Sequence, residues 1–411
     1  MATVFFGITS ENNARQNIDR WIGVAGAPDV FSEKDQNLTN FAGKLLGAYD
    51  VVSLDEALRR YPGADVWVTY RKADNTAKTL LAKLPPERIH FFDADLEYRR
   101  GCKYLGNFIY YREHSFSPCG VVSETPVVRA SGPIKERLAE WQEYTTQLVG
   151  DIRREKPNGC QDCQFLKYGF WQKTIGLKTI SLEANQRGDK CNFNCTYCFC
   201  ADAFKRLEHK TEGFTTYEIL KQIAEIPQYN SEDVTVQLAN GEICANENLD
   251  GILDIISNAK WKIELWSNFS IYQEKLAALM ESGRITRAVT SLDAGTKETF
   301  ERIKRADCFD QVVENLRNYP VGKTRLYLQY VFLEGVNDNE TDVDGYYEIA
   351  KELGGVILLS SDLKAAYTEK MRDLTLRLIK RLKADGMWID ATSSYLNSAD
   401  REFIIGSYEN S

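Results

Sequence analysis

The stretch Cys191-Asn192-Phe193-Asn194-Cys195-Thr196-Tyr197-Cys198 decides how the rest of the chain is interpreted. It places three cysteines in a C-x3-C-x2-C spacing, shortly after the strand-like run 177–182. A loop that leaves a strand can turn three thiolates inward onto one cofactor. Thiolates are soft ligands that select iron–sulfur clusters, zinc or Cu(I). The spacing favours an iron–sulfur site, while a zinc site with Cys200 as fourth ligand and buried structural thiols stay open as alternatives.

Length, charge and cysteine content narrow the class of protein. The 411 residues exceed one average domain and predict two or three. A net charge of −8 without a long basic run predicts no nucleic-acid partner. The first residues lack the features of a signal peptide, and no apolar run reaches the ~20 residues that span a bilayer. We therefore expect a cytoplasmic protein without a membrane partner, whose ten cysteines are metal or catalytic ligands rather than disulfides.

Residues 1–97 have the pattern of a small α/β domain. Strands are expected at 3–9, 65–70 and 88–92, and helices at 54–60 and 73–84. Strand, helix, strand is the pattern of a parallel, Rossmann-like sheet. No G-x-G-x-x-G occurs, so a docking or substrate-orienting role is favoured over dinucleotide binding.

Residues 98–174 form a cysteine-bearing module with four further thiols, Cys102, Cys119, Cys160 and Cys163. The last two make a C-x2-C pair, and a charged helical stretch is expected at 134–155. Four cysteines in one segment match the full ligand count of a second metal site. An iron–sulfur cluster, structural zinc and unrelated free thiols remain open here. A fully ligated cluster has no open iron, so it would carry electrons or brace the fold.

From residue 175 to 411, strands and helices alternate. Strands are expected at 179–184, 234–238, 263–266, 287–291, 325–332 and 355–359. Thr215-Thr216-Tyr217-Glu218 is a capping box that begins the first helix, and further helices are expected at 249–258, 272–283, 297–303, 308–319, 339–353 and 367–385. Six β–α units with right-handed crossovers predict a curved parallel sheet.

Polar motifs follow the strands of this sheet, at the edge where parallel α/β sheets bind ligands. They are Asn240-Gly241-Glu242, Trp266-Ser267-Asn268 and Ser291-Leu292-Asp293-Ala294-Gly295-Thr296. A carboxylate such as Glu242 is a suitable acceptor for a cationic amine, because charge-assisted hydrogen bonds are strong. Turn capping explains Ser267 and Asn268 equally well.

Together these motifs resemble the radical S-adenosylmethionine (radical SAM) superfamily, in which three cysteines bind a 4Fe–4S cluster and Tyr197 occupies a usually aromatic position. The resemblance implies a partial (β/α)6 TIM-like barrel over 175–411. It also implies that S-adenosylmethionine chelates the open iron and that Asn240, Gly241 and Glu242 hold its ammonium, Asn240 standing where a glycine is usual. Ser267, Asn268 and Ser291 would contact ribose or carboxylate, and Asp293 would face the substrate cavity.

The element Cys102-Lys103-Tyr104-Leu105 and the Ser291–Thr296 signature are similar to radical SAM proteins linked to glycan or peptide biosynthesis. The resemblance implies that Cys102, Cys119, Cys160 and Cys163 bind a second, auxiliary 4Fe–4S cluster.

The expected activity is that of a radical SAM oxidoreductase. It would cleave S-adenosylmethionine reductively to a 5′-deoxyadenosyl radical, with a reductant such as flavodoxin or ferredoxin, and abstract hydrogen from a sugar or glycan precursor or a peptide. Cys244 and Cys308 lie outside both ligand sets; either could return a hydrogen atom to a substrate radical, or both are buried structural thiols. The alternatives are a ribosomal-peptide epimerase or cyclase, and a non-enzymatic zinc or iron–sulfur scaffold.

Overall fold

The computed structural model describes residues 2–7, 11–33, 44–45, 49–69, 79–92, 96–102, 104–112, 115–119, 128–129, 133–163, 165–173, 175–182, 186–198, 200, 213–239, 241–362, 367–390 and 398–410. Within these ranges, every helix is too short or too polar to cross a membrane. The chain forms two compact units, Met1–Gly106 with Thr145–Gly176, and Asn107–Tyr144 with Leu177–Ser411. The expected division into three parts, 1–97, 98–174 and 175–411, stays a prediction.

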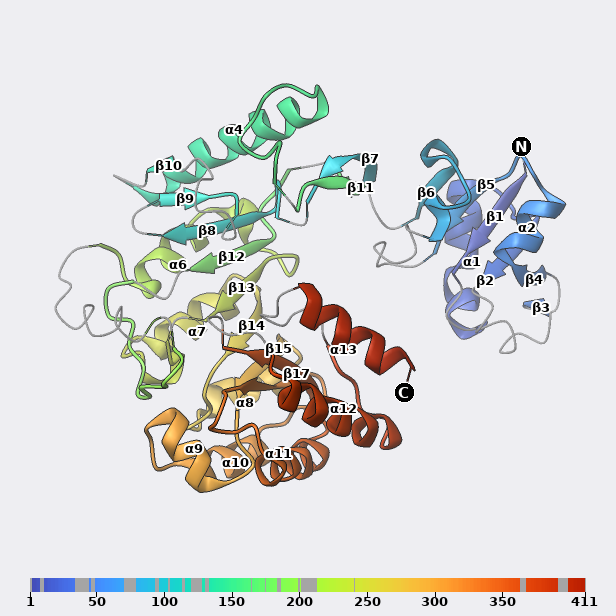
Figure 1. Ribbon diagram of the computed structural model, residues 1–411. Coiled ribbons are helices and arrows are strands. Elements are labelled where there is room, and N and C mark those ends of the chain that lie inside the picture. The colour runs from blue at the N-terminus through green and yellow to red at the C-terminus, as the bar shows by residue number, and fades with distance from the viewer. Residues whose placement is uncertain are drawn as a thin grey trace. The chain divides into compact units, whose positions relative to one another are not determined.

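The smaller unit contains a six-stranded sheet with the strand order β3-β4-β2-β1-β5-β6 (Figure 1). Neighbouring strands are parallel except for β3 and β4. The strands are β1 (Thr3–Phe6), β2 (Val30–Glu33), β3 (Lys44–Leu45), β4 (Tyr49–Ser53), β5 (Asp65–Val68) and β6 (Ile89–Phe91). The expected parallel, Rossmann-like sheet is therefore confirmed, with β2, β3 and β4 as strands that the sequence patterns did not indicate.

Helices cover both faces of this sheet. Helix α1 (Glu11–Ala25) packs Trp21 against Phe5 and Phe31 on one face. Helix α2 (Leu54–Arg60), predicted with the same bounds, packs Leu54 and Ala57 on the other. Of the helix expected at 73–84, residues 73–78 lie outside the described residues, and 79–81 are helical. A separate antiparallel pair in this unit joins β7 (Leu96–Gly101) to β11 (Lys167–Gln172).

The larger unit is built on a nine-stranded sheet with the order β10-β9-β8-β12-β13-β14-β15-β16-β17. Strand β8 and the six strands from β12 to β17 are parallel to one another. Strands β9 and β10 are added at the β8 edge by antiparallel pairing. Their bounds are β8 (Phe108–Arg112), β9 (Ser115–Ser117), β10 (Val128–Arg129), β12 (Thr179–Leu182), β13 (Thr235–Leu238), β14 (Lys262–Trp266), β15 (Ile285–Ser291), β16 (Arg325–Phe332) and β17 (Val356–Ser361).

Helices follow the six strands from β12 to β17 in turn. They are α6 (Thr216–Ala224), α7 (Leu249–Asn258), α8 (Glu274–Glu281), α9 (Lys297–Lys304), α10 (Phe309–Asn318), α11 (Glu340–Leu353) and α12 (Glu369–Ala384), followed by α13 (Ser398–Asn410). The predicted capping box is present, because Thr215 and Glu218 each bond the other's backbone N–H. Six parallel β–α repeats confirm the expected partial barrel. The sheet nevertheless extends beyond the prediction, since β8 places Ile109 and Tyr111 of the expected cysteine module in the same core.

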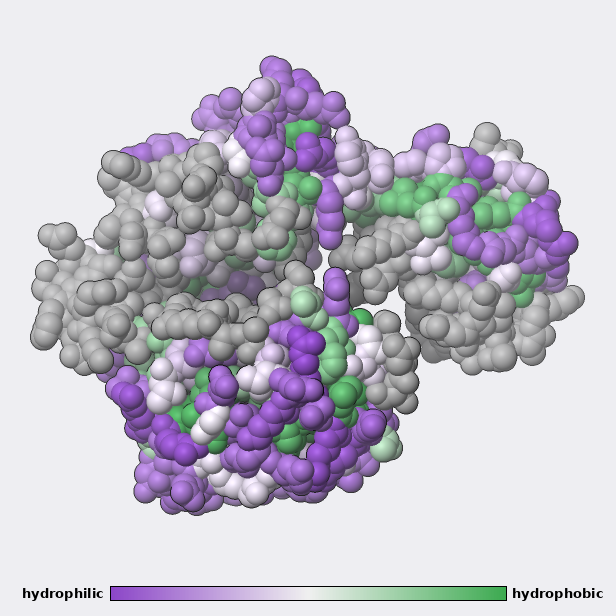
Figure 2. Space-filling view, viewed as in Figure 1, coloured by the Kyte–Doolittle hydropathy of each residue, from purple (hydrophilic) through white to green (hydrophobic). Residues whose placement is uncertain are grey.

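The two faces of the larger sheet differ in polarity. Alternate residues of each strand, such as Leu326, Leu328 and Tyr330 in β16, enter the apolar core beneath the helices. The intervening residues form the opposite face, which we call the inner face. On the outer surface, Figure 2 shows hydrophilic residues around α11 and α12, where Arg377 and Arg381 pair with carboxylates of α11. Helix α4 (Ile134–Arg153) contributes Leu138 and Trp141 to the same core.

A close backbone approach fixes the loop after β15 against α11. A Cβ atom on Gly345, in the middle of α11, would collide with the carbonyl group of Gly295. We therefore expect Gly345→Ala to lower the free energy of unfolding by about 1–3 kcal/mol through overpacking, although alanine is ordinarily the better helix former. Denaturant unfolding of the purified chain measures this.

Gly406 in α13 is the matched control, because a Cβ atom there meets nothing within 4 Å. Gly406→Ala should leave stability unchanged or raise it by up to about 1 kcal/mol. Equal effects of the two substitutions would contradict the close approach.

Candidate functional site

The structure brings the predicted motifs together at the carboxyl edge of the larger sheet. The cysteine loop (residues 186–198) follows β12, and the loops of Glu242, Ser267 and Asp293 follow β13, β14 and β15. The backbone N–H of Glu242 donates to the carbonyl of Lys190 at 2.9 Å. Four neighbouring strand ends thus contribute to one site.

Side-chain amides join the cysteine loop to the loop after β14. Asn268 Nδ2 donates to Asn192 Oδ1 at 2.8 Å, and Asn192 Nδ2 donates to Ser270 Oγ at 2.8 Å. Asn268 is therefore placed beside the first cysteine, and its hydrogen bond to Asn192 gives it a structural role. Its contact with a cofactor stays a prediction.

The cysteine loop also caps helix α9. The backbone N–H groups of Asn194 and Thr196 donate to the carbonyls of Lys304 and Ile303, at 3.3 and 2.9 Å. The last carbonyls of a helix have no partner within the helix, so an external donor is needed there. The helix ends at Arg305 in the left-handed conformation, with φ of 54°. The cysteine loop thus takes its backbone partners from the helix that follows Ser291–Thr296.

The three thiols of the cysteine loop are partly buried and influence one another. Burial raises the pKa of Cys191 to about 12, and the charges of Glu242, Cys195 and Cys198 act in the same direction. Burial also raises the pKa of Cys195, while the ammonium of Lys304 opposes that shift. The thiols of Cys191 and Cys195 are therefore protonated at neutral pH, and a metal would have to displace their protons.

Three thiolates are the donor set that leaves one iron of a four-iron cube open. Within the described ranges, no group of three or more Cys, His, Asp or Glu side chains is arranged to hold a metal ion. A cube binds each thiolate at a different iron, so its ligands do not converge on one point as the ligands of a single ion do. The donor set of the loop fits such a cluster, and no single-ion geometry is seen.

Asp293 occupies a different position from the one expected. Its side chain is completely buried rather than facing a cavity, and its backbone has φ of 59°. One carboxylate oxygen accepts from the N–H of Val331 at 2.8 Å. The other accepts from the ammonium of Lys304 and the hydroxyl of Tyr197. Asp293 therefore joins β15, β16, α9 and the cysteine loop.

Tyr197 belongs to the cysteine loop and contacts both Asp293 and Lys304. Lys304 Nζ donates to the Tyr197 hydroxyl at 3.0 Å and stands 5.2 Å from the centre of its ring. Burial and the nearby Asp293 charge raise the pKa of Tyr197, so the hydroxyl keeps its proton. Burial alone would lower the pKa of Lys304. The charges of Asp293, Tyr197 and Cys195 and the hydrogen bond to Asp293 together outweigh burial and raise that pKa. Lys304 and Asp293 are therefore a charged pair inside the protein.

Glu242 forms a second buried carboxylate centre and is only 1% exposed. It accepts from Ser267 Oγ at 2.8 Å, from the N–H of Asn268 at 2.6 Å and from the N–H of Cys244 at 3.0 Å. Burial raises the pKa of Glu242, and these three hydrogen bonds offset part of the rise. The Cys244 thiol hydrogen-bonds to Glu242 as well. A carboxylate has about four acceptor positions, so a cationic amine would have to take the place of one of these four donors.

The other predicted residues are placed as follows. Ser291 Oγ donates to Gln329 Oε1 at 3.0 Å on the inner face, and Gly241 makes the turn before Glu242 with φ of 67°. Asn240 lies outside the described residues. Cys244 is buried beside Glu242, whose charge and hydrogen bond add to burial in raising the pKa of the thiol. Cys308 precedes α10 and packs against the helical core.

Lys304 and Asn337 are residues that sequence reasoning missed. Asn337 Nδ2 donates to the carbonyls of Asp293 and Val331 at 2.7 and 2.8 Å. A signal for Lys304 was available, because Phe300 and Lys304 are four residues apart and share the buried side of α9. A lysine at a core position of an amphipathic helix indicates a buried partner.

Three of the four cysteines of the second group, Cys102, Cys160 and Cys163, belong to the smaller unit. Cys102 directly follows β7, and the loop of Cys160 and Cys163 precedes β11. Because Lys167 of β11 pairs with Gly101 of β7, both lie at the same end of this antiparallel strand pair. Arg100 reinforces this by donating to the carbonyl of Gln161 at 3.0 Å. Cys119 belongs to the larger unit. Lys103 of the Cys-Lys-Tyr-Leu element lies outside the described residues.

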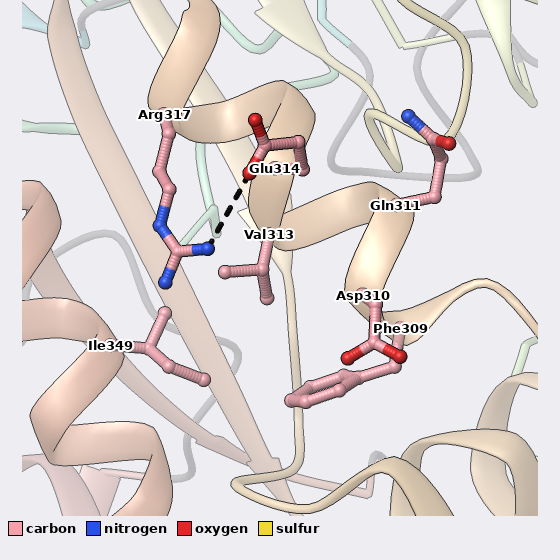
Figure 3. Close-up of a pocket in the computed structure, with 7 residues that line it drawn as sticks. All are labelled: Phe309, Asp310, Gln311, Val313, Glu314, Arg317 and Ile349. Carbon is pink, nitrogen blue, oxygen red and sulfur yellow. Dashed lines mark ion pairs between the residues drawn. The ribbon is translucent and has the colours of Figure 1, made fainter.

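A hollow of about 500 Å³ lies elsewhere, between α10 and α11 (Figure 3). Arg317 and Glu314, both from α10, pair at its border. It is lined by Phe309, Asp310, Gln311, Val313, Glu314, Arg317 and Ile349. None of these is a predicted site residue, so the hollow is separate from the carboxyl-edge site.

Comparisons with known proteins agree with this geometry. The sequence model of the Radical SAM superfamily matches residues 185–346. The GTP 3′,8-cyclase of Aliarcobacter butzleri is 27% identical over 191 residues, which cover 46% of this chain and 55% of that protein. The probable dual-specificity RNA methyltransferase RlmN of Aquifex aeolicus is 26% identical over 179 residues, covering 40% and 49%.

The crystal structure of Streptococcus suis SuiB bound to S-adenosylmethionine aligns with a TM-score of 0.41 and 10% identity, over 63% of this chain and 56% of that one. The chain spans about half the length of the two curated relatives. The matched residues contain the cysteine loop and the strand ends that surround it. This chain therefore carries a radical SAM domain.

Proposed function

We propose that this protein is a radical SAM enzyme that takes a hydrogen atom from a C–H bond of its substrate. With a three-thiolate 4Fe–4S cluster and S-adenosylmethionine bound, such a domain supplies a 5′-deoxyadenosyl radical by reductive cleavage of the sulfonium. The observation that carries the proposal is the convergence of the cysteine loop, Glu242 and the Asp293 pair at one edge of the sheet.

Each residue has a distinct part in the proposal. Cys191, Cys195 and Cys198 are the cluster ligands, and Glu242 accepts the ammonium of S-adenosylmethionine in place of the Cys244 thiol. Ser267, already bonded to Glu242, keeps that carboxylate in place. Asn268 and Ser291 would contact the cofactor's polar groups, and Asn240 and Gly241 would hold its ammonium together with Glu242. Productive abstraction requires near-contact of the reacting atoms, so a rigid frame serves the chemistry.

Asp293 and Tyr197 are positioning residues in this proposal. Their mutual hydrogen bond and the ammonium of Lys304 fix the cysteine loop against α9. The complete burial of Asp293 supports this role in place of direct contact with substrate.

The substrate in this proposal is a sugar or glycan precursor, including a nucleotide-linked sugar, and the overall reaction is that of an oxidoreductase. A relative named GTP 3′,8-cyclase supports a nucleotide-bearing substrate. The second candidate is a peptide epimerase or cyclase, for which Cys244 is the hydrogen donor. The protonated, buried thiol of Cys244 beside Glu242 favours it for that role over Cys308.

The partners of the proposed enzyme follow from its chemistry. Reductive cleavage needs an electron, for which flavodoxin or ferredoxin is the expected source, and the proposed setting is the cytoplasm. One relative is named as an RNA methyltransferase, whereas the net charge of −8 here supports a substrate other than nucleic acid.

An auxiliary 4Fe–4S cluster is proposed at Cys102, Cys119, Cys160 and Cys163. The antiparallel pairing of β7 with β11 supports it, because Cys102 and the C-x2-C loop lie at the same end of this strand pair. A structural zinc site uses the same donors and is the alternative. The non-enzymatic scaffold predicts zinc at both cysteine groups and no cleavage of S-adenosylmethionine.

Replacing Cys191, Cys195 or Cys198 by alanine should abolish 5′-deoxyadenosine formation, because each substitution removes a ligand of the open-iron cluster. The measurement is product formation by anaerobically purified protein with S-adenosylmethionine and dithionite. Cys200→Ala is the control and should retain the product. Loss of zinc in Cys200→Ala, with unchanged product in the other three variants, would refute the assignment.

Replacing both Cys160 and Cys163 by alanine should remove about half of the bound iron, since one of two four-iron clusters is lost. Iron, sulfide and zinc are counted in the purified protein. A full iron content would exclude an auxiliary cluster there, and loss of one zinc instead would identify a structural zinc site.

Replacing Lys304 by methionine should lower the free energy of unfolding by about 3 kcal/mol, because it leaves the buried Asp293 carboxylate without its cation. The double variant Asp293→Asn with Lys304→Met removes both charges and should recover most of the loss. Denaturant unfolding of the metal-free protein measures both. If the double variant is no more stable than Lys304→Met alone, the two residues are not a coupled pair.

A further inference from the structure

The inner face of the larger sheet carries an arginine, Arg287, that makes no ion pair with the described residues. Arg287 lies in β15, next to Ala288, which enters the helical core. Successive side chains of a strand point to opposite faces, so Arg287 and Val289 belong to the inner face. The strand register places Glu264 of β14 on one side of Arg287 and Arg325 of β16 on the other.

The guanidinium of Arg287 makes no ion pair or hydrogen bond with the part of the chain that the structure describes. Its Nε is buried and lacks an acceptor. The neighbouring carboxylate of Glu264 instead accepts from Gln237 Nε2 at 2.9 Å. A buried donor without a partner costs free energy. We therefore expect a group outside the described residues to accept hydrogen bonds from this arginine.

Two aromatic rings orient the guanidinium. Its Cζ atom lies 4.3 Å from the ring centre of Tyr327 and 5.5 Å from that of Trp266. Such contacts hold an arginine side chain in place without supplying a counter-charge. The donors at the rim of the guanidinium therefore stay available to an anion, which arginine binds with two parallel hydrogen bonds.

The surroundings leave room for a ligand. Trp266, Gln329 and Ser291 on the inner face are partly exposed. Tyr327, with Arg325 and Val356, also lines a cavity of about 830 Å³ that reaches the amino-terminal ends of β16 and β17. Arg287 precedes Ser291 by four residues, a rise of roughly 13 Å along the strand. Ser291 at the carboxyl edge therefore lies at the opposite end of the strand from this cavity.

We propose that Arg287 binds an oxyanion, a phosphate or a carboxylate, of the molecule on which the enzyme acts. The identification of that molecule as the substrate rests on the proposed function, whereas the anion site itself does not. Trp266 and Tyr327 flank the guanidinium and give the adjoining part of the ligand flat surfaces on which to pack.

The test measures binding of two probes to the full chain, purified anaerobically, at about 0.15 M ionic strength. Pyrophosphate represents a phosphorylated ligand, and malonate represents a carboxylate; isothermal titration calorimetry measures each. Arg287→Gln should raise the dissociation constant of the probe that binds more tightly at least about tenfold, because it removes a charge-assisted contact. Arg377→Gln, in helix α12 on the outer surface, removes the same single charge. This variant should bind the probes as tightly as the unaltered protein does.

A labelling experiment on the unaltered protein keeps the test valid if Arg287→Gln does not fold. Phenylglyoxal modifies accessible arginines, and mass spectrometry of the digest locates the label. The preferred probe should protect Arg287 and leave Arg377 unprotected. Binding of neither probe, equal binding by Arg287→Gln, or unprotected labelling of Arg287 would overturn the proposal. These measurements do not involve cleavage of S-adenosylmethionine. A failure of the anion site can therefore be distinguished from a failure of the proposed reaction.

Discussion

The contact between the cysteine loop and the end of helix α9 is the constraint on which the site depends. The described part of that loop lies outside helices and strands, so its backbone groups need partners elsewhere. The carbonyls of Ile303 and Lys304 accept two of its N–H groups, and the ammonium of Lys304 bonds Tyr197 within it. Helix α9 thereby sets the position of the cysteines relative to the sheet.

The buried pair of Lys304 and Asp293 makes this contact specific. Removing two charges from water is costly, and their attraction offsets that cost only when further hydrogen bonds satisfy both groups. Val331 and Tyr197 supply such bonds to Asp293, and Asn337 fixes its backbone carbonyl. A displaced cysteine loop would leave these charges less well satisfied, so the network opposes alternative positions of the loop.

The two faces of the sheet divide stability from chemistry. The face beneath the helices is an apolar core, in which strand residues such as Leu328 and Ile357 are completely buried. The inner face carries Gln237, Glu264 and Arg287 beside a smaller apolar cluster of Val289, Tyr327 and Leu358. Polar residues on a partly buried face are free to serve recognition because the core on the other face already supplies the hydrophobic stabilisation.

The sequence by itself determined the parallel β–α repeats and the identity of the motifs, because periodicity and helix caps are local properties. Helix α7 and strand β16 have the predicted bounds, and Glu242 and Asn268 lie beside the cysteine loop as expected. The tertiary structure alone decided that β8 joins the large sheet and that Asp293 is buried with Lys304. Both depend on contacts between residues distant in the chain or on opposite sides of a turn. The spacing of Phe300 and Lys304 indicates that Lys304 is buried, but the identity of its partner depends on how the loop after β15 folds back on α9.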